Sequence, residues 1–209
     1  EASGVATVIG LADYFKDKKT DFSMVFMAFN AEEIVSIEEF ESWFEQGFQA
    51  TTRQNIIEHL EALKNELGGL DLLIISSGTG DLNENLDFDI EKRTIDTNVT
   101  GFTCISNWAF NLFERQKSGH LVVITSVGGL RGSGIAPAYN ATKAYQINYL
   151  EGLRQKASKL EGQIFVTDVR PGFVDTDMAK GEGQFWVASV EKATRQIFNA
   201  IKQRKKMVY

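Results

Sequence analysis

Short apolar runs and long amphipathic stretches alternate along the chain from about residue 71 onward. The apolar runs cover residues 72–75, 120–125 and 163–169, and each is followed by serine, arginine, proline or glycine. Uninterrupted apolar runs of this length indicate strands of a parallel sheet that is covered on both faces. Residues 88–116, 137–159 and 190–203 are predicted to form helices, each long enough to cross over the sheet. The pattern therefore predicts an α/β fold with a doubly wound parallel sheet.

The first 70 residues carry a weaker pattern. Residues 5–14 and 37–48 are predicted to be helical, and residues 23–29 are predicted to form the second strand. A further helix is predicted over residues 55–67, because Ile56, Leu60, Leu63 and Leu67 fall on one face. A sheet of this class begins with a strand that leads into a glycine-rich turn, whereas this sequence begins within the turn, at Ser3-Gly4. We expect the first strand to be missing from the given chain.

Composition and charge narrow the class of protein. With 43% hydrophobic and 24% charged residues, the 209-residue chain can bury a substantial core. A net charge of -6 argues against nucleic-acid and anionic-membrane partners, and no apolar run reaches the roughly 18 residues of a membrane span. The single cysteine, Cys104, fits a reducing compartment. We expect a cytoplasmic protein without nucleic-acid or membrane partners. No metal site is expected, because His59 and His120 have no ligand-like neighbours in sequence.

Tyr139 and Lys143 stand four residues apart near the start of the predicted helix 137–159, so they lie one turn apart on the same face. A phenol has a pKa of about 10 in water, and a neighbouring ammonium lowers it. Such a pair can act as a general acid/base, although the same spacing is common on helix surfaces without any function. Ser126 adds to the pair, because it closes a strand ahead of a glycine-rich loop and thirteen residues before Tyr139.

Several segments together resemble one known family. The run from Gly119 to Ser126, followed by Tyr139-Asn140-Ala141-Thr142-Lys143, is similar to the strand, serine and Tyr-x-x-x-Lys region of the short-chain dehydrogenase/reductase family. Asn98-Val99-Thr100-Gly101 resembles its Asn-Val-x-Gly segment, and the stretch from Pro171 to Thr176 resembles its Pro-Gly-x-Val-x-Thr loop. The resemblance covers about residues 70–209. It implies a single Rossmann-type oxidoreductase domain over residues 1–209, with a degenerate cofactor half (1–70) and a catalytic half (71–209).

The resemblance also implies a role for each matching residue. Tyr139 exchanges the substrate proton, Lys143 tunes Tyr139 and holds the nicotinamide ribose, Ser126 bonds the substrate oxygen, and Asn98 supports a proton path to Lys143. Read singly, Ser126 and Thr176 would be caps and Asn98 a polar contact within a helix. The implied cofactor-binding residues are Ser3, Gly4, Val5, Ser77, Gly78, Asn98, Tyr139, Lys143, Pro171, Gly172, Val174 and Thr176.

The cofactor half departs from the family pattern. Ile75-Ser76-Ser77-Gly78 replaces the family's Asn-Asn-Ala-Gly segment, which keeps the glycine and loses both amides. Ala28 and Phe29 end the predicted second strand, where an NAD-binding site carries an acidic residue for the ribose 2′-hydroxyl. The missing acid favours NADP(H) over NAD(H). The arginine expected beside a 2′-phosphate is missing as well, and Lys18 or Lys19 is the available substitute.

The resulting hypothesis is an enzyme that reduces a carbonyl or oxidises a secondary alcohol of a small, partly hydrophobic substrate. Residues 178–189 form either an apolar lid over that substrate or simple packing. The alternative is a catalytically silent family member that acts as a binding or regulatory module, which the degenerate first half motivates. The resemblance further implies a homodimer or homotetramer through helices 88–116 and 137–159. Trp108, Phe110 and Phe113 would suit that interface or the core equally.

Overall fold

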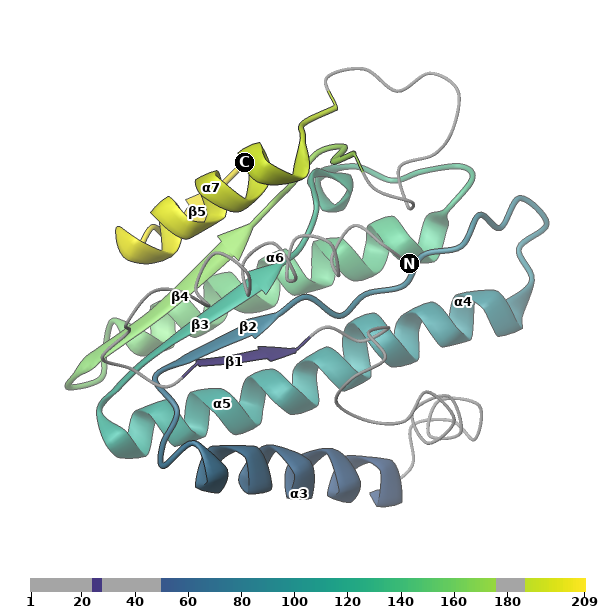
Figure 1. The fold of residues 1–209 in the computed structure, drawn as a ribbon. Coiled ribbons are helices and arrows are strands. Elements are labelled where there is room, and N and C mark those ends of the chain that lie inside the picture. Colours follow the sequence, from purple (N-terminus) through teal and green to yellow (C-terminus); the bar gives the residue numbers. More distant parts are fainter. Residues whose placement is uncertain (1–23, 28–49, 176–186) are drawn as a thin grey trace.

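The computed structural model of the chain describes residues 24–27, 50–175 and 187–209 (Figure 1). Within these residues, one sheet of five parallel strands has the order β1-β2-β3-β4-β5. The strands are β1 (Met24–Met27), β2 (Leu72–Ile75), β3 (Ser118–Ile124), β4 (Gln163–Val169) and β5 (Met207–Val208). The parallel pairing confirms the sheet predicted from the apolar runs, and β4 has the predicted bounds.

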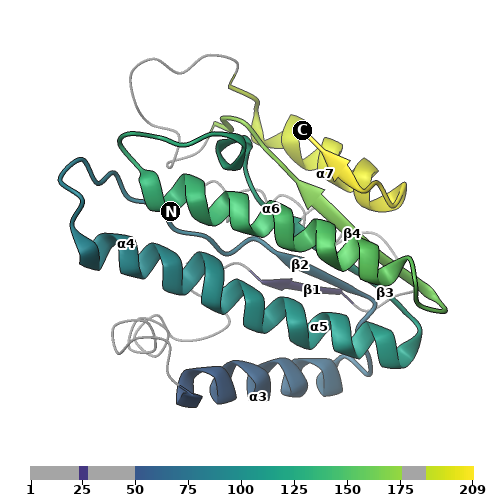
Figure 2. The ribbon, with the colours of Figure 1, turned by 180° about the vertical axis from the view of Figure 1, so that it is seen from behind.

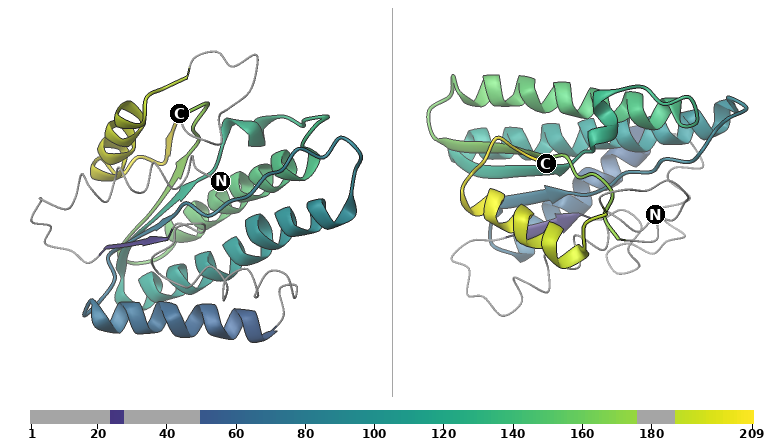
Figure 3. Two further views of the ribbon diagram at one scale, coloured as in Figure 1. Left: turned by 45° about the vertical axis from the view of Figure 1, so that its right-hand side comes forward. Right: turned by 90° about the horizontal axis from the view of Figure 1, so that it is seen from above.

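Helices cover both faces of this sheet (Figures 1 and 2). One face packs against α3 (Ala50–Glu66), α5 (Phe102–Gln116) and α6 (Pro137–Ala157), and the other packs against α7 (Val190–Lys202). Alternation along the strands divides the core: Leu73 and Val123 face the first group of helices, whereas Leu72 and Val122 face α7. The view from above in Figure 3 shows the same layers. The arrangement confirms the doubly wound α/β fold.

The helix predicted over residues 88–116 is interrupted. It consists of α4 (Phe88–Ile95), a π-helical segment η1 (Asp96–Gly101) and α5 in direct succession. The wider turn moves the side chains on either side of it to different positions around the helix axis, and such turns are frequent at functional sites. Asn98 lies in the middle of η1 and is fully buried. Apolar periodicity does not reveal the insertion, because the residues on both sides still form helix.

One expectation from the sequence is corrected. Residues 23–29 were expected to form the second strand, but β1 pairs directly with β2, the place that the first strand takes in the order 3-2-1-4. The backbone groups along β2 need a partner on that side, and Met24–Met27 supplies it. Trp108, Phe110 and Phe113, for which interface and core were both open, are buried in the core shared by α3, α5 and α6.

Some predicted features lie outside the described residues. They are the helices at 5–14 and 37–48, the lid residues 178–186, and Ser3, Gly4, Val5, Ala28, Phe29 and Thr176. In the part of the chain that the structure describes, no helix is both long and apolar enough to cross a membrane. No group of three or more His, Cys, Asp or Glu side chains gathers there as a metal site would require.

Candidate active site

Tyr139 and Lys143 lie in the first turns of α6, at the carboxyl end of β3. Pro137 begins α6, which suits a first turn whose N–H groups have no helical partner. Lys143 is buried, with 4% of its surface exposed, and its Nζ donates to the carbonyl oxygen of Ile124 at 3.2 Å. The same Nζ lies 5.8 Å from the centre of the Tyr139 ring. The two side chains are therefore brought together, as their spacing predicts.

Ser126 stands immediately beyond β3. It caps the short 3-10 helix η2 (Val127–Leu130), and its Oγ accepts from the Gly128 N–H at 2.9 Å. The capping role expected for a serine read alone is thus present, but it uses only acceptor capacity and leaves the hydroxyl proton to donate. Asn140 holds the loop on α6, because its Nδ2 donates to the carbonyl oxygens of Gly128 at 2.8 Å and Arg131 at 2.7 Å.

Asn98 joins three segments that are far apart in sequence. Its Oδ1 accepts from the Thr79 N–H at 2.9 Å, and its Nδ2 donates to the Thr79 carbonyl oxygen at 2.7 Å. The same Nδ2 donates to Thr142 Oγ1 at 3.0 Å, and the Asn98 carbonyl oxygen accepts from Gln146 Nε2 at 2.8 Å. The side chain thus ties the loop after β2 to α6.

The segment after β4 lies beside Ser126. The Val127 N–H donates to the Pro171 carbonyl oxygen at 3.1 Å, which links the loops after β3 and β4. Val174 is buried and forms an isolated parallel bridge with Ala188. The Asp175 N–H donates to the Ala188 carbonyl oxygen at 2.9 Å, which closes the base of the segment leading to α7. Pro171, Gly172 and Val174 are thus placed at the edge of the sheet where Tyr139 lies, as predicted.

The end of β2 fits the nicotinamide cofactor that the sequence implies. The hydroxyls of Ser76 and Ser77 are buried, and among the described residues neither has a hydrogen-bond partner. A buried hydroxyl without a partner is costly, so a polar ligand group there would satisfy it. At Gly78 an added Cβ would stand 2.9 Å from Lys143 Nζ, so the glycine lets the backbone lie close beside the ammonium. Ser77 and Gly78 are thus suited to a polar ligand that approaches Lys143.

Burial dominates the ionisation of both catalytic candidates. Desolvation raises the pKa of Tyr139, and the hydrogen bond with Ser126 acts in the opposite direction. Desolvation lowers the pKa of Lys143 to about 8, while the charge of Asp168 raises it. The sequence argument expected a lowered phenol pKa from the nearby ammonium. The structure reverses that direction, because removal of the phenolate from water outweighs the hydrogen bond with Ser126.

A buried ionic network that the sequence analysis missed lies under α6. Asp168 is fully buried and accepts from Thr125 Oγ1 at 2.6 Å. Its other carboxylate oxygen accepts from Arg170 Nε at 2.8 Å and NH2 at 2.7 Å, and Arg170 NH1 donates to the Tyr209 hydroxyl at 3.1 Å. Asp168 directly follows Thr167 in β4. Two adjacent polar residues inside a predicted buried strand were the signal in the sequence for this network.

Two further residues complete the helix face that carries the site. Thr142 and Gln146 follow Tyr139 by three and seven positions, which places them with Lys143 on one side of α6. Both bond Asn98, through its side chain and its carbonyl oxygen respectively. A search for polar residues at helical spacing from Tyr139 would have found them. Their contact with Asn98 could not be read from the sequence.

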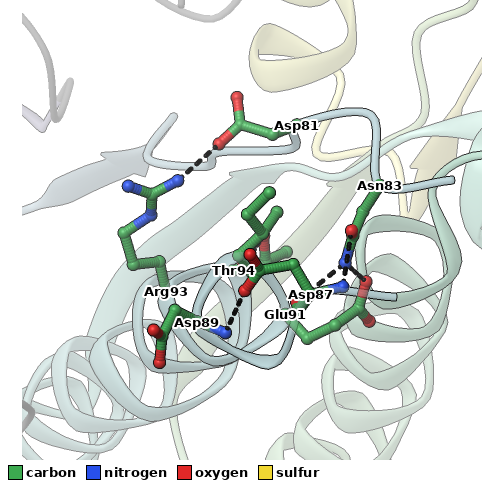
Figure 4. Close-up of polar contacts among 8 residues, drawn as sticks. Asp81, Asn83, Asp87, Asp89, Glu91, Arg93 and Thr94 are labelled. Carbon is green, nitrogen blue, oxygen red and sulfur yellow. Dashed lines mark hydrogen bonds and ion pairs between the residues drawn. The ribbon is translucent and has the colours of Figure 1, made fainter. Parts of the chain in front are cut away.

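The loop between β2 and α4 is held by its own polar network, which Figure 4 shows at close range. Asn83 is buried, and its Nδ2 donates to the Asp87 carbonyl oxygen at 2.9 Å and to Glu91 Oε1 at 2.6 Å. The Asn83 N–H donates to the Ile135 carbonyl oxygen at 2.8 Å, which joins this loop to the one before α6. Asp81 pairs with Arg93 at 3.3 Å. The loops around Tyr139 therefore support one another.

Comparison with known proteins points to one family. The sequence pattern of the family described as short chain dehydrogenase matches residues 4–185. A protein of Myxococcus xanthus (strain DK1622) named as an uncharacterized oxidoreductase is 35% identical over 125 residues, which are 58% of this chain and 48% of that protein. The chain spans about half the length of the curated relatives it matches.

Solved structures share the fold. A short-chain dehydrogenase from Sphingobium yanoikuyae in complex with NADPH superposes with a TM-score of 0.74 at 17% identity, covering 99% of this chain and 83% of that one. The bulky-bulky ketone specific alcohol dehydrogenase from Comamonas testosteroni gives a TM-score of 0.71 at 17% identity, covering 96% and 80%. At this identity the likeness concerns the fold.

Proposed function

The chain belongs to the short-chain dehydrogenase family, and from this premise we propose that it is a nicotinamide-dependent oxidoreductase. It reduces a carbonyl, or oxidises a secondary alcohol, of a small and partly hydrophobic substrate. The observation that carries the proposal is the convergence of Ser126, Tyr139 and Lys143 at the carboxyl end of β3, with Asn98 behind them. In open α/β sheets ligands bind at this edge. Residues 1–209 act as one domain in this proposal.

The proposed cofactor is NADP(H), in preference to NAD(H). When bound, it supplies or takes up the hydride. Ser77, Gly78, Asn98, Tyr139, Lys143, Pro171, Gly172 and Val174 would hold it, together with Ser3, Gly4, Val5 and Thr176 of the undescribed segments. The support for a nicotinamide is the pair of unpartnered hydroxyls at Ser76 and Ser77 and the close approach that Gly78 permits. The preference for NADP(H) is supported by the NADPH complex of a structural neighbour.

In the proposed mechanism, the Ser126 hydroxyl donates to the substrate oxygen, since its acceptor side already bonds the Gly128 N–H. Tyr139 Oη gives its proton to the same oxygen in reduction and takes it back in oxidation. The Lys143 ammonium stabilises the phenolate that results, at an Nζ to ring-centre distance of 5.8 Å. Asn98 supports the return of a proton to Lys143 from its buried position between the loop after β2 and α6.

The partly hydrophobic character of the substrate rests on the loops around the site. Exposed apolar side chains project from the loops after β2, β3 and β4, namely Leu82, Leu130, Ile135 and Phe173. Single exposed apolar residues are ordinary, but these four lie on loops that hydrogen bonds link at the edge of the sheet where Tyr139 lies. Each buried CH2 group contributes about 0.8 kcal/mol, so kcat/KM should rise roughly fourfold for each methylene added to a homologous series of ketones. A flat series would refute an apolar pocket.

The central test uses one matched pair of variants. The purified protein is mixed with NADPH or NADH and a panel of carbonyl compounds, and oxidation of the nicotinamide is followed by absorbance. Tyr139→Phe should abolish turnover while leaving the unfolding temperature unchanged, because only the hydroxyl that donates the proton is removed. Tyr145→Phe is the control, since Tyr145 lies on the same helix as Tyr139 but its hydroxyl bonds Thr103 of α5 at 2.9 Å. Full turnover by Tyr139→Phe would refute the proposed mechanism.

The alternative function is a catalytically silent binding or regulatory module, favoured by the altered glycine and amide segments of the first half. Fluorescence titration with both reduced nicotinamides separates the two. Binding with turnover supports the enzyme, whereas no binding of either nicotinamide supports the silent module. Competition between NADPH and NADH in the same titration measures the cofactor preference.

A homodimer or homotetramer is proposed as the assembled form. Its support is the exposure of Phe88 and Ile95 on α4, where isolated apolar side chains meet solvent in the single chain. Light scattering of the wild type and of Ile95→Glu measures the mass. A wild type at the mass of one chain, 23.3 kDa for these residues, would refute the assembly.

A further inference from the structure

The ring of Tyr139 lies directly against the backbone of Gly80. A Cβ added to Gly80 would stand 2.2 Å from Tyr139 Cδ2, 2.7 Å from Cγ and 3.0 Å from Cε2. Ordinary contacts of a Cβ lie at 3.4–4 Å, so one more methyl group would force the ring or the loop to move by about 1 Å. Only a residue without a side chain permits this approach.

The ring is also confined on its other side. A Cβ added to Gly128 would stand 3.4 Å from Tyr139 Cε1 and 3.2 Å from Ser126 Oγ. The segment that carries Gly128 cannot retreat, because a Cβ at Gly129 would meet the backbone of Lys143 at 2.7 Å and of Ala144 at 2.9 Å. The phenol therefore lies between the backbones of two loops, one on its Cδ2 side and one on its Cε1 side.

The loop that carries Gly80 is held in place just before it. Asn98, fully buried in η1, bonds both the N–H and the carbonyl oxygen of Thr79 through its side-chain amide. Gly78, on the other side of Thr79, lies against Lys143 Nζ. The segment Gly78-Thr79-Gly80 is thus a rigid wall that touches both members of the Tyr139 and Lys143 pair.

We propose that Gly80 is a positioning residue that sets where the Tyr139 hydroxyl stands relative to Ser126, with Asn98 holding the wall through Thr79. This inference rests on the proposed function, because it assigns the contact a role in proton transfer from Tyr139. Proton transfer depends steeply on the separation of donor and acceptor. A displacement of about 1 Å at a reacting group costs on the order of 100-fold in rate.

The decisive variant is Gly80→Ala, with Gly152→Ala as its matched control. Gly152 lies on the exposed side of α6 and has no atom within 4 Å of an added Cβ, so its exchange should leave kcat unchanged. For Gly80→Ala, kcat should fall by about 10- to 100-fold while the nicotinamide dissociation constant stays within about twofold. A Gly80→Ala variant with wild-type kcat overturns the inference and leaves the proposed function standing.

A double variant separates positioning from a general loss of structure. If Gly80 acts only through the Tyr139 hydroxyl, Gly80→Ala in a Tyr139→Phe background should lower the residual rate no further. An additional loss of the same size in that background would overturn the inference. If the wild type binds nicotinamide but turns over no substrate, the proposed function fails. The contact is then tested by a crystal structure of Gly80→Ala, in which an undisplaced Tyr139 ring would overturn it.

Discussion

Replacement of Lys143 by methionine should make the protein more stable and abolish its activity. Lys143 is buried with 4% of its surface exposed, and desolvation lowers its pKa from 10.5 to about 8. Methionine has a similar unbranched shape and carries no charge to desolvate. The charge of Lys143 therefore lowers the stability of the folded protein, and Lys143→Met removes that cost.

The size of this stability cost follows from the shift in the pKa of Lys143. The difference between 10.5 and about 8 corresponds to about 3 kcal/mol, at 1.36 kcal/mol for each pKa unit. Because the folded pKa lies below the unfolded one, the unfolded state binds more protons between these two values, and stability rises with pH across that window. The advantage of Lys143→Met should thus be largest near pH 7. It should shrink by about 2 kcal/mol between pH 7 and pH 9.5.

The assay is urea denaturation of the wild type and of Lys143→Met at both pH values, without nicotinamide. Taking the difference between the variants cancels the titration of other groups, provided they do not couple to Lys143. Lys156→Met is the control, because this lysine extends from the surface of the same helix with 49% of its side chain exposed. A gap between wild type and Lys143→Met that stays constant from pH 7 to 9.5 would refute the desolvation argument.

Three further predictions concern groups away from the reaction. Burial lowers the pKa of His120 from 6.5 to about 4, so the unfolded state binds the proton first as the pH falls. Between these two pKa values the free energy of unfolding should drop by about 1.4 kcal/mol for each unit by which the pH falls. His120→Gln should lack this dependence in urea denaturation, and equal slopes would contradict it. Asp168→Asn leaves the Arg170 guanidinium buried without its carboxylate, which should cost about 3–5 kcal/mol by the same assay; a loss below 1 kcal/mol would sink this prediction. Gly119→Ala places a Cβ 2.1 Å from Phe113 Cδ1 at a φ of +152°, and a thermal melt should show a loss of about 1–3 kcal/mol.

Much of the architecture could be predicted because buried parallel strands are apolar throughout. The runs at β2, β3 and β4 stand out for that reason, and Pro137 marks the start of α6. The position of β1 in the sheet was harder to predict. A short apolar run shows that a strand is present, but the neighbour it pairs with depends on which strand edge is open.

The residues of the candidate site also differ in how far the sequence predicts their positions. Tyr139 and Lys143 lie four residues apart on one helix, so local geometry brings them together, and Ser126 is predicted at the edge of the sheet because it follows a strand. The π-helical turn at Asn98 leaves no mark on the hydrophobic pattern, and its bonds to Thr79 and Thr142 span 19 and 44 residues. Such long-range pairings depend on how the crossovers pack.

The sequence by itself determined the sheet, the helices that cross it, and the reactive groups at its carboxyl edge, because these follow from periodicity and from spacing within single elements. Only the tertiary structure decided the ionisation of those groups and the contact of the segment Gly78-Thr79-Gly80 with Tyr139 and Lys143. Burial sets the pKa of Tyr139 and Lys143, and it depends on every neighbour at once. The contact of Gly80 with the Tyr139 ring arises because two distant loops meet there, and a glycine in a loop shows nothing of what lies against it.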